Sequence, residues 1–298
     1  MESAATRSHF EKLESKVDEG VGNVIEWLAL VRRFKLRRSE KVTTHGCALL
    51  RDSSLRRKLG SEVWTVYEQV AIAAMDCQCL DVSKMCIEVL IAKFPNSARV
   101  GRLEGMLYEA KGQWQQAETK YQTLLELQPS DAFAYKRKVA IAKAQGNLGA
   151  AIEALKQYLD TFMADQEAWR ELAEIYIALQ KYSQAAFCYE ELILMETANA
   201  TWHLMYAEVQ YTLGGLENLR IARKYYASAI KLSAGKNLRS LYGLCMCSAV
   251  LSQTKGRAKD EEGTELQSLA SSVIMKKYKE KCPNKARLVT SFLEKQKL

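Results

Sequence analysis

Histidine and proline are scarce in this sequence, since each occurs only three times among 298 residues. The histidines, His9, His45 and His203, are far apart in the sequence and offer little material for a histidine-activated nucleophile. Phosphate-binding loops, dinucleotide-binding fingerprints, nucleophile elbows and H-E-x-x-H zinc motifs are absent from the sequence as well. We therefore expect no enzyme activity and no cofactor.

Long apolar runs are also missing. The longest, 243–251, has nine residues, whereas a helix needs about 18–20 to cross a bilayer. Residues 1–20 are polar and charged, without the apolar segment of a secretory signal. We expect a chain without a membrane span that stays in a reducing compartment.

Cysteines number eight, but they are scattered along the chain. The two C-x-C pairs, Cys77/Cys79 and Cys245/Cys247, would point to different faces of a helix, and no histidine is near them in the sequence. We expect packed, reduced thiols and no metal site.

What the sequence does contain is a repeat with a period of 34 residues. One register holds Gly105, Val139, Ala173 and Ala207, and a second holds the small residues Ala117, Ala151 and Ala185. This period with these residue types is typical of the tetratricopeptide repeat, a helix–turn–helix unit that buries its apolar face only by stacking on neighbours. The pattern predicts an all-α fold, a right-handed α-solenoid of tetratricopeptide repeats with helical caps at both ends.

The same register divides the chain. We expect an N-terminal tail and helical cap over 1–60, the solenoid over 61–253, and a polar loop with a C-terminal helical cap over 254–298. The expected repeats are 64–97, 98–131, 132–165, 166–199 and 200–235, with a last partial unit from 236.

The N-terminal segment has no repeat signal. Residues 1–20 look unstructured or weakly helical, and an amphipathic helix starts at Val21 and runs into the basic stretch that ends at Lys41. A further helix is expected at 47–59. The basic helix has two interpretations, a cap on the first repeat or a helix lying on a membrane, and the need of solenoids for caps favours the first.

Beyond Asn199 the register slips. Ala222 follows Ala185 by 37 residues instead of 34, and we place the three extra residues in a longer inter-helix loop at 215–218. A polar loop at 253–262, a helix around 266–277 and a final basic helix at 285–296 should complete the C-terminal cap.

Basic residues are concentrated at the ends of the chain. Lys and Arg outnumber Asp and Glu by 13 to 8 in residues 1–60 and by 11 to 6 in 254–298, but not in 61–253, with 19 against 21. A nucleic-acid groove would want a basic stripe along the repeats, so we expect no nucleic-acid partner. An anionic membrane surface or an acidic partner remains compatible with the basic ends.

In this repeat type, the first helices line the concave groove through positions 2, 5, 9, 12 and 13. Those positions hold Arg99, Arg102, Met106, Glu109, Phe133, Lys136, Ala140, Lys143, Glu167, Arg170, Glu174, Ile177, Thr201, Leu204, Glu208 and Tyr211. The basic residues among them form a strip made of Arg99, Arg102, Lys136, Lys143 and Arg170, and an acidic strip follows, made of Glu167, Glu174 and Glu208. Either they are ordinary solvated charges, or they hold an extended peptide by side-chain pairing. On the second interpretation, replacing Arg102 and Lys136 by Glu should weaken partner capture without unfolding the chain.

A free cytosolic adaptor or co-chaperone that binds peptide segments is the alternative function. Chaperone-binding repeats clamp a C-terminal carboxylate with Lys and Asn at the fifth and ninth positions of a unit. Here the ninth positions are Met106 and Ala140, and the Asn is missing throughout the groove. A chaperone-tail clamp is therefore not expected.

Several stretches resemble the subunit 2 family of the endoplasmic reticulum membrane protein complex. They are 64–76 (WTVYEQVAIAAMD), 136–146 (KRKVAIAKAQG), 165–176 (DQEAWRELAEIY), and 206–219 (YAEVQYTLGGLENL) continuing into 222–226 (ARKYY). The last stretch contains the irregular insertion, which a generic repeat would not share. The likeness covers roughly 60–250.

The resemblance implies a non-catalytic scaffold peripheral to the endoplasmic reticulum membrane, on its cytoplasmic side. Such a subunit would hold cytosolic tails and loops of membrane-embedded subunits and dock a second soluble subunit. The family's complex inserts tail-anchored and multi-pass membrane proteins. Membrane association would then be mainly indirect, through these partners.

Overall fold

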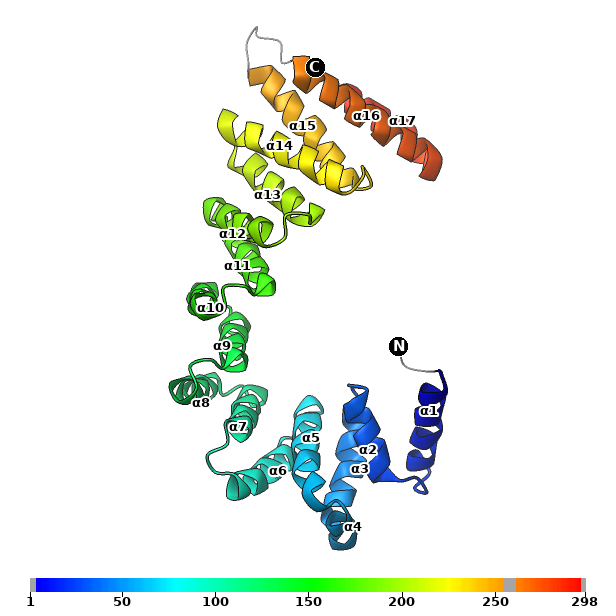
Figure 1. The fold of residues 1–298 in the computed structure, drawn as a ribbon, viewed down its shortest axis with the longest axis vertical. Coiled ribbons are helices and arrows are strands. Elements are labelled where there is room, and N and C mark those ends of the chain that lie inside the picture. Colours follow the sequence, from blue (N-terminus) through cyan, green and yellow to red (C-terminus); the bar gives the residue numbers. More distant parts are fainter. Residues whose placement is uncertain (1–3, 255–260, 296–298) are drawn as a thin grey trace. The chain divides into compact units, whose positions relative to one another are not determined.

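The computed structural model describes residues 4–254 and 261–295, and within these ranges the secondary structure is helical, with no strand (Figure 1). The chain forms two compact units, residues 1–154 and 155–298, each described here by itself. The expected all-α tetratricopeptide solenoid with terminal helices is confirmed, because paired helices follow one another in the order that the 34-residue period predicts.

The first unit starts with helices that precede the repeats. They are α1 (Ala4–Asp18), α2 (Val24–Arg33), α3 (Ser39–Arg51), α4 (Ser53–Lys58) and the short 3₁₀ helix η1 (Gly60–Glu62). The expectation of an unstructured or weakly helical 1–20 is wrong. Phe10, Leu13 and Val17 lie on one face of α1 and are buried in the N-terminal core.

The expected helix from Val21 to Lys41 is also wrong in its extent. α2 ends at Arg33, the chain turns through Lys35, whose φ is +51°, and Lys41 belongs to α3. Trp27 and Leu28 are completely buried, so the apolar face of α2 is turned into the core. Of the two interpretations of this segment, the cap is therefore the one that its packing supports.

The helix expected at 47–59 is divided in two. α3 already begins at Ser39, and Asp52 ends it and caps α4, since its Oδ1 accepts a hydrogen bond of 2.8 Å from the backbone N–H of Ser54. A side chain that caps the next helix in this way fixes a sharp break between the two.

The repeats of the first unit follow. Their helices are α5 (Val63–Asp76), α6 (Leu80–Lys93), α7 (Ala98–Ala110), α8 (Trp114–Leu127), α9 (Ala132–Ala144) and α10 (Leu148–Thr161), the last of which crosses the division between the units. Small residues lie where the helices approach most closely. Ala71, Ser83 and Ala117 are completely buried, and a Cβ on Gly105 would lie 2.5 Å from the ring of Tyr121.

The second unit continues the pairs. It contains α11 (Gln166–Ala178), α12 (Tyr182–Met195), α13 (Ala200–Leu213), α14 (Leu216–Leu232), α15 (Leu238–Thr254), α16 (Glu261–Lys281), the 3₁₀ helix η2 (Pro283–Lys285) and α17 (Ala286–Lys295). Ala185, Ala207 and Ala222 are completely buried in the expected register. Small residues are thus buried between the helices on both sides of the position where the spacing of the repeat grows from 34 to 37 residues.

The three extra residues of that step do not lengthen the loop. Gly214 and Gly215, with φ of +70° and +80°, form a two-residue link, and the insertion instead lengthens α14 to 17 residues against 14 in α12. Asn218 donates a 2.8 Å hydrogen bond from its side chain to the carbonyl of Gly214 and stabilises the first turn. Only glycine tolerates two successive left-handed residues readily, which explains why so short a link suffices here.

The C-terminal helices pack on α15. Ala270 and Ile274 of α16 and Val289 and Leu293 of α17 are buried with it in one core. α16 and α17 are separated at Cys282 and Pro283, as expected. Of the polar loop expected at 253–262, residues 255–260 lie outside the described residues.

Candidate partner-binding groove

The expected groove residues of the first unit come from α7 and α9. At the second position of α7, the Arg99 guanidinium contacts the carboxylate of Glu68 on α5, with Nε 2.8 Å from Oε1 and Nη2 2.7 Å from Oε2. Arg99 is nevertheless largely exposed. The Glu68 side chain is only 20% exposed, so this pair is an internal contact between α5 and α7 rather than a free surface charge.

Arg102 is placed differently, since it holds two repeats together. Its Nε lies 2.9 Å from Oδ2 of Asp131, whose side chain is only 2% exposed. The other oxygen of Asp131 caps α9 by accepting the backbone N–H of Phe133 at 3.0 Å. Arg102 also lies over the ring of Phe133, 5.5 Å from its centroid. We therefore expect Arg102→Glu to destabilise the fold, so this substitution does not test partner capture by itself.

Glu109 is likewise committed within the protein. Its carboxylate accepts hydrogen bonds from the hydroxyl of Tyr121 at 2.6 Å and from Nε of Arg137 at 2.8 Å, and its side chain is nearly buried. Burial, followed by the hydrogen bond to Glu109, raises the pKa of Tyr121, so the phenol stays protonated as a donor. This cluster is a packing device between α7, α8 and α9.

The remaining positions of the first unit differ in exposure. Lys136, Ala140 and Lys143 of α9 are exposed, whereas Met106 and Phe133 are half-buried. Among the expected groove positions of this unit, the cations with exposed side chains are Arg99, Lys136 and Lys143. They are the part of the expected basic strip that a partner can reach.

In the second unit, Arg170 lies among carboxylates of its own helix. It contacts Glu167 at 2.5 Å and Glu174 at 3.3 Å, one turn away on either side. Pairs of this spacing stabilise a helix by only a few tenths of a kcal/mol when exposed. Leu204 is buried in the core, and Tyr211 packs against the same cluster, so neither is presented freely to a partner.

A cavity of about 340 Å³ opens on the first helices of the second unit and includes three of the expected residues, Glu174, Ile177 and Glu208. Its other lining residues are Tyr182, Tyr189, Met205, Val209, Thr212 and Arg239. Burial raises the pKa of Tyr189 to about 12, so its hydroxyl is neutral at physiological pH. The cavity joins apolar side chains to a small number of polar groups, the composition that ligand-binding pockets share.

Glu208 and Arg239 form the charged pair of this cavity. Nη2 of Arg239 lies 2.7 Å from Oε2 of Glu208. Burial raises the pKa of Glu208, and the charge and hydrogen bonds of Arg239 oppose that rise only in part. A cationic side chain from a partner would stabilise the charge of this buried carboxylate further. Glu208 is therefore the acidic groove residue best suited to bind a cation.

The groove positions derived from the sequence omitted Arg239. We expected the last unit to begin near Lys236, but α15 begins at Leu238, so Arg239 is its second residue, as Arg99 is in α7. Both arginines contact a glutamate that lies 31 residues earlier in the sequence, Glu68 and Glu208 respectively. That repeated separation was the signal in the sequence that could have identified Arg239.

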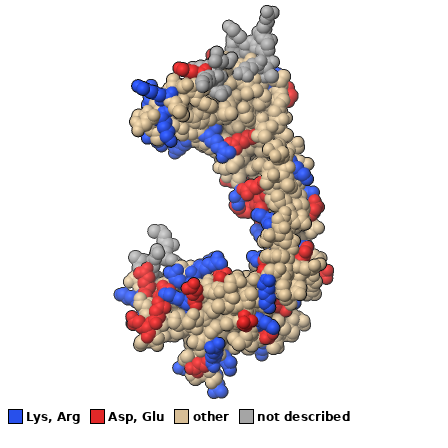
Figure 2. Space-filling model, turned by 180° about the vertical axis from the view of Figure 1, so that it is seen from behind, with Lys and Arg blue, Asp and Glu red and all other residues tan. Residues whose placement is uncertain are grey.

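Basic and acidic side chains are interspersed over the face drawn in Figure 2, so neither sign forms a continuous field. Within the described ranges, no group of His, Cys, Asp or Glu is arranged to hold a metal ion. No helix that the structure describes is both long enough and apolar enough to cross a membrane.

Known proteins resemble this chain in both sequence and fold. The model of the EMC2 TPR-like repeat domain matches residues 80–215. ER membrane protein complex subunit 2 of Xenopus tropicalis is 43% identical over 249 residues, which cover 83% of each chain. The subunit of the same name in Dictyostelium discoideum is 32% identical, covering 94% of this chain and 93% of its own.

Two further matches are consistent with these. TPR repeat protein oca3 of Schizosaccharomyces pombe is 31% identical, covering 76% of this chain and 79% of its own. Among solved structures, the C-terminal part of a TPR repeat-containing protein from Cytophaga hutchinsonii superimposes with a TM-score of 0.54 at 16% identity, covering 80% of this chain and 93% of that one. At that identity the last match supports the fold alone.

Proposed function

This chain belongs to the ER membrane protein complex subunit 2 family, and we propose that it is a non-catalytic scaffold subunit of that complex. In this role it lies at the cytoplasmic side of the endoplasmic reticulum membrane. It holds cytosolic tails and loops of the membrane-embedded subunits and docks a second soluble subunit. It thereby supports the insertion of tail-anchored and multi-pass membrane proteins without taking part in insertion chemistry.

The observation that supports this proposal beyond family membership is that charged residues of the first helices differ in exposure. Arg102 and Glu109 contact partners between the helices, and the side chains of Asp131 and Glu109 in these contacts are nearly buried, whereas Lys136 and Lys143 of α9 are exposed. A scaffold needs both kinds of residue, one to fix the spacing of the repeats and one to contact a partner. An extended tail that carries carboxylates would pair with the exposed lysines.

The second unit offers a complementary surface. Its cavity beside Glu174 and Glu208 has an apolar part formed by Ile177, Met205 and Val209. A partner segment with a basic side chain between apolar ones fits this composition. Its cation would stabilise the charged form of Glu208, whose pKa burial raises, and its apolar side chains would bury area against the cavity. We assign this cavity to a basic segment of an integral subunit.

Membrane fractionation with cross-linking tests the proposal. After alkaline carbonate extraction the chain should leave the membrane pellet, as a peripheral protein does. Cross-links in intact membranes should join the first helices of the repeats to cytosolic segments of integral partners. Deleting those partners should release the chain into the soluble fraction.

The same experiment separates the alternatives. A free cytosolic adaptor would be soluble in cells that have all integral partners and would give no cross-links to them. A protein that binds the bilayer directly would remain on anionic liposomes made without any protein. Either result would contradict the scaffold assignment.

A further inference from the structure

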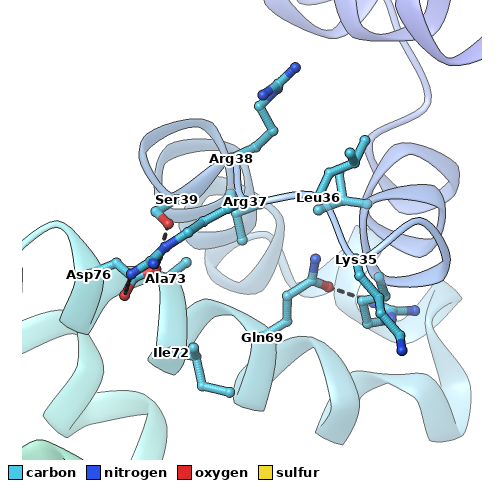
Figure 3. Close-up of a pocket in the computed structure, with 12 residues that line it drawn as sticks. Lys35, Leu36, Arg37, Arg38, Ser39, Gln69, Ile72, Ala73 and Asp76 are labelled. Atoms are coloured by element: carbon cyan, nitrogen blue, oxygen red, sulfur yellow. Dashed lines mark hydrogen bonds and ion pairs between the residues drawn. The ribbon is translucent and has the colours of Figure 1, made fainter. Parts of the chain in front are cut away.

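A cavity of about 520 Å³ lies in the first unit, and none of its lining residues belongs to α7 or α9 (Figure 3). It opens between the turn that joins α2 to α3 and one face of α5. Val31, Leu36, Val42 and Ile72 supply its apolar surface. Ile72 lies at a groove position of the first repeat, whereas the cations and Leu36 come from α2 and the turn after it, which the repeat pattern does not predict.

The local sequence explains how the cavity forms. At the end of α2, Lys35 donates its backbone N–H to the carbonyl of Arg32 at 3.1 Å, and Leu36 donates to Val31 at 3.0 Å. This pair of bonds is the Schellman arrangement, which brings Leu36 back against Val31. Its left-handed residue is usually glycine, as at Gly112 and Gly146, but here it is Lys35, with φ of +51°. The turn therefore presents a cation at the mouth of an apolar hollow.

Four cations line the cavity, Arg32, Lys35, Arg37 and Arg38, against one carboxylate, Asp76. The formal charge of the lining is thus +3, from four positive groups and one negative. Three of these cations are ion-paired, Arg32 with Glu62, Arg37 with Asp76 and Arg38 with Glu14, so Lys35 is the cation left to attract a carboxylate.

The arginines are held by contacts within the unit. Arg32 donates to Oε1 of Gln69 at 2.7 Å, and Arg37 contacts both oxygens of Asp76, at 3.0 and 2.6 Å. Arg38 donates to Glu14 at 3.1 Å. In Figure 3 the Arg37 side chain extends along one wall to Asp76, while Gln69 and Ile72 come from α5 below. These contacts set the walls of the cavity.

Lys35 differs from the arginines. It is exposed, and among the described side chains no carboxylate forms a salt bridge with it. A cation that is already paired gains little from a new carboxylate, because the first pair must be broken. For Lys35 no ion pair has to be broken first, so it is the cation best placed to contact a carboxylate of a partner.

We propose that this cavity binds a segment of a partner protein in which one or two bulky apolar side chains are flanked by Asp or Glu. The apolar side chains enter between Leu36 and Ile72, and a carboxylate contacts Lys35. A volume of about 520 Å³ accommodates two or three side chains and not a folded domain. This docking site adjoins the groove, because Ile72 and Asp76 hold the ninth and thirteenth positions of the repeat 64–97. Its peptide binding can still be tested without the scaffold assignment.

A polypeptide fits this site better than a lipid bilayer does. A helix that binds a membrane projects its apolar face outward, but Trp27, Leu28 and Val31 of α2 are turned into the core. The apolar surface that remains is recessed and bordered by cations. It can receive a protruding side chain, whereas a flat lipid surface would meet only the charged border.

Fluorescence anisotropy with the full-length chain tests the proposal. The probes are short fluorescein-labelled peptides in which a leucine or phenylalanine lies between pairs of glutamates, made with several spacings. Matched probes replace every glutamate by glutamine, or the apolar residue by serine. At least one acidic–apolar probe should bind, its affinity should fall as salt is raised, and both matched probes should bind at least about ten-fold more weakly.

Two variants locate the binding. Lys35→Gly removes the cation and relieves the left-handed backbone, so it should keep or raise the melting temperature while weakening the probe about five-fold. Ile72→Asp places a negative charge in the apolar surface at a position that is already 36% exposed, and should weaken binding more than ten-fold. Lys111→Gln and Met85→Asp are the matched controls, since both residues are exposed outside the cavity and should leave binding unchanged.

Three results would overturn the proposal. They are the absence of binding by every acidic–apolar probe at millimolar concentration, equal binding of the glutamine probes, and insensitivity of binding to Lys35→Gly and Ile72→Asp. Vesicles of phosphatidylcholine with phosphatidylserine form the last arm. Binding to them that requires Lys35, without peptide binding, would assign the site to a membrane surface instead. None of these results bears on carbonate extraction or on cross-links to α7 and α9, so a failure of this site can be told apart from a failure of the scaffold assignment.

Discussion

The guanidinium of Arg102 and the carboxylate of Asp131 meet at 2.9 Å, where the N-terminus of α9 approaches α7. Asp131 is nearly inaccessible to water and also caps α9. One carboxylate thus fixes both the start of a helix and its distance from the preceding repeat. A charge reversal at Arg102 is therefore expected to lower the stability of the fold as well as to change the groove surface.

We predict that Arg102→Glu destabilises the chain by about 2 kcal/mol, because it leaves a buried carboxylate facing a second negative charge. Arg102→Lys, which keeps the charge, should lose less. Urea unfolding followed by circular dichroism measures the difference. Unchanged stability of Arg102→Glu would show that Asp131 does not depend on its partner.

For the groove, the informative substitutions are Lys136→Glu and Lys143→Glu, since both side chains are exposed. The double variant should unfold like the original chain but co-purify with at least several-fold less of its acidic partners. Lys111→Glu, an equal charge change outside the expected groove positions, is the control. Equal recovery of partners by both variants would exclude these lysines from the interface.

Gly105→Ala should destabilise the first unit by roughly 1–3 kcal/mol, because the added methyl group would lie 2.5 Å from the ring of Tyr121. The matched control is Gly149→Ala in α10, where the nearest atom outside the helix backbone is 3.5 Å away. There the same substitution should be neutral or stabilising by up to about 1 kcal/mol. Thermal unfolding of the two variants compares them directly, and similar melting temperatures would contradict the close packing at Gly105.

Glu208→Gln tests the electrostatics of the acidic cavity. Burial raises the pKa of Glu208 in the folded chain, so the folded state binds the proton more tightly than the unfolded state does. The original chain should therefore lose stability as pH rises from the unfolded pKa through the raised folded pKa. The Gln variant should lack this loss and be the more stable of the two at neutral pH.

The measurement is urea unfolding of both chains across that pH range. The two stability curves should converge on the acidic side, where Glu208 is protonated in both states. A Gln variant that is less stable at neutral pH would mean that the contacts with Arg239 outweigh burial.

The repeats could be predicted from the sequence because the same residue type recurs at each position where helices pack closely. Ala117, Ala151 and Ala185 recur at 34 residues, and all three are completely buried. The N-terminal helix was missed for the opposite reason. Phe10, Leu13 and Val17 carry the helical spacing, but they occur once, among charged residues, with no second copy to support the pattern.

The groove was predicted as a set of positions but not as a set of roles. Register alone places Arg102 and Lys136 on equivalent helix faces. It cannot show that Asp131, the cap of the next helix, comes within reach of one of them. The extra residues before Ala222 were assigned to a loop because a polar Gly-Gly segment usually is one, whereas the two glycines turn so tightly that the helix takes up the added length.

Glu14 of α1 holds Arg38 and Lys41 together, at 3.1 and 3.2 Å. Arg38 is also one of the cations that line the cavity beside Lys35. Detachment of the first helix would leave this arginine without its carboxylate and strengthen the local positive potential. The carboxylate of Glu14 thus competes with an acidic ligand for Arg38 while α1 is attached, so attachment of this helix would weaken binding of such a ligand in the neighbouring cavity.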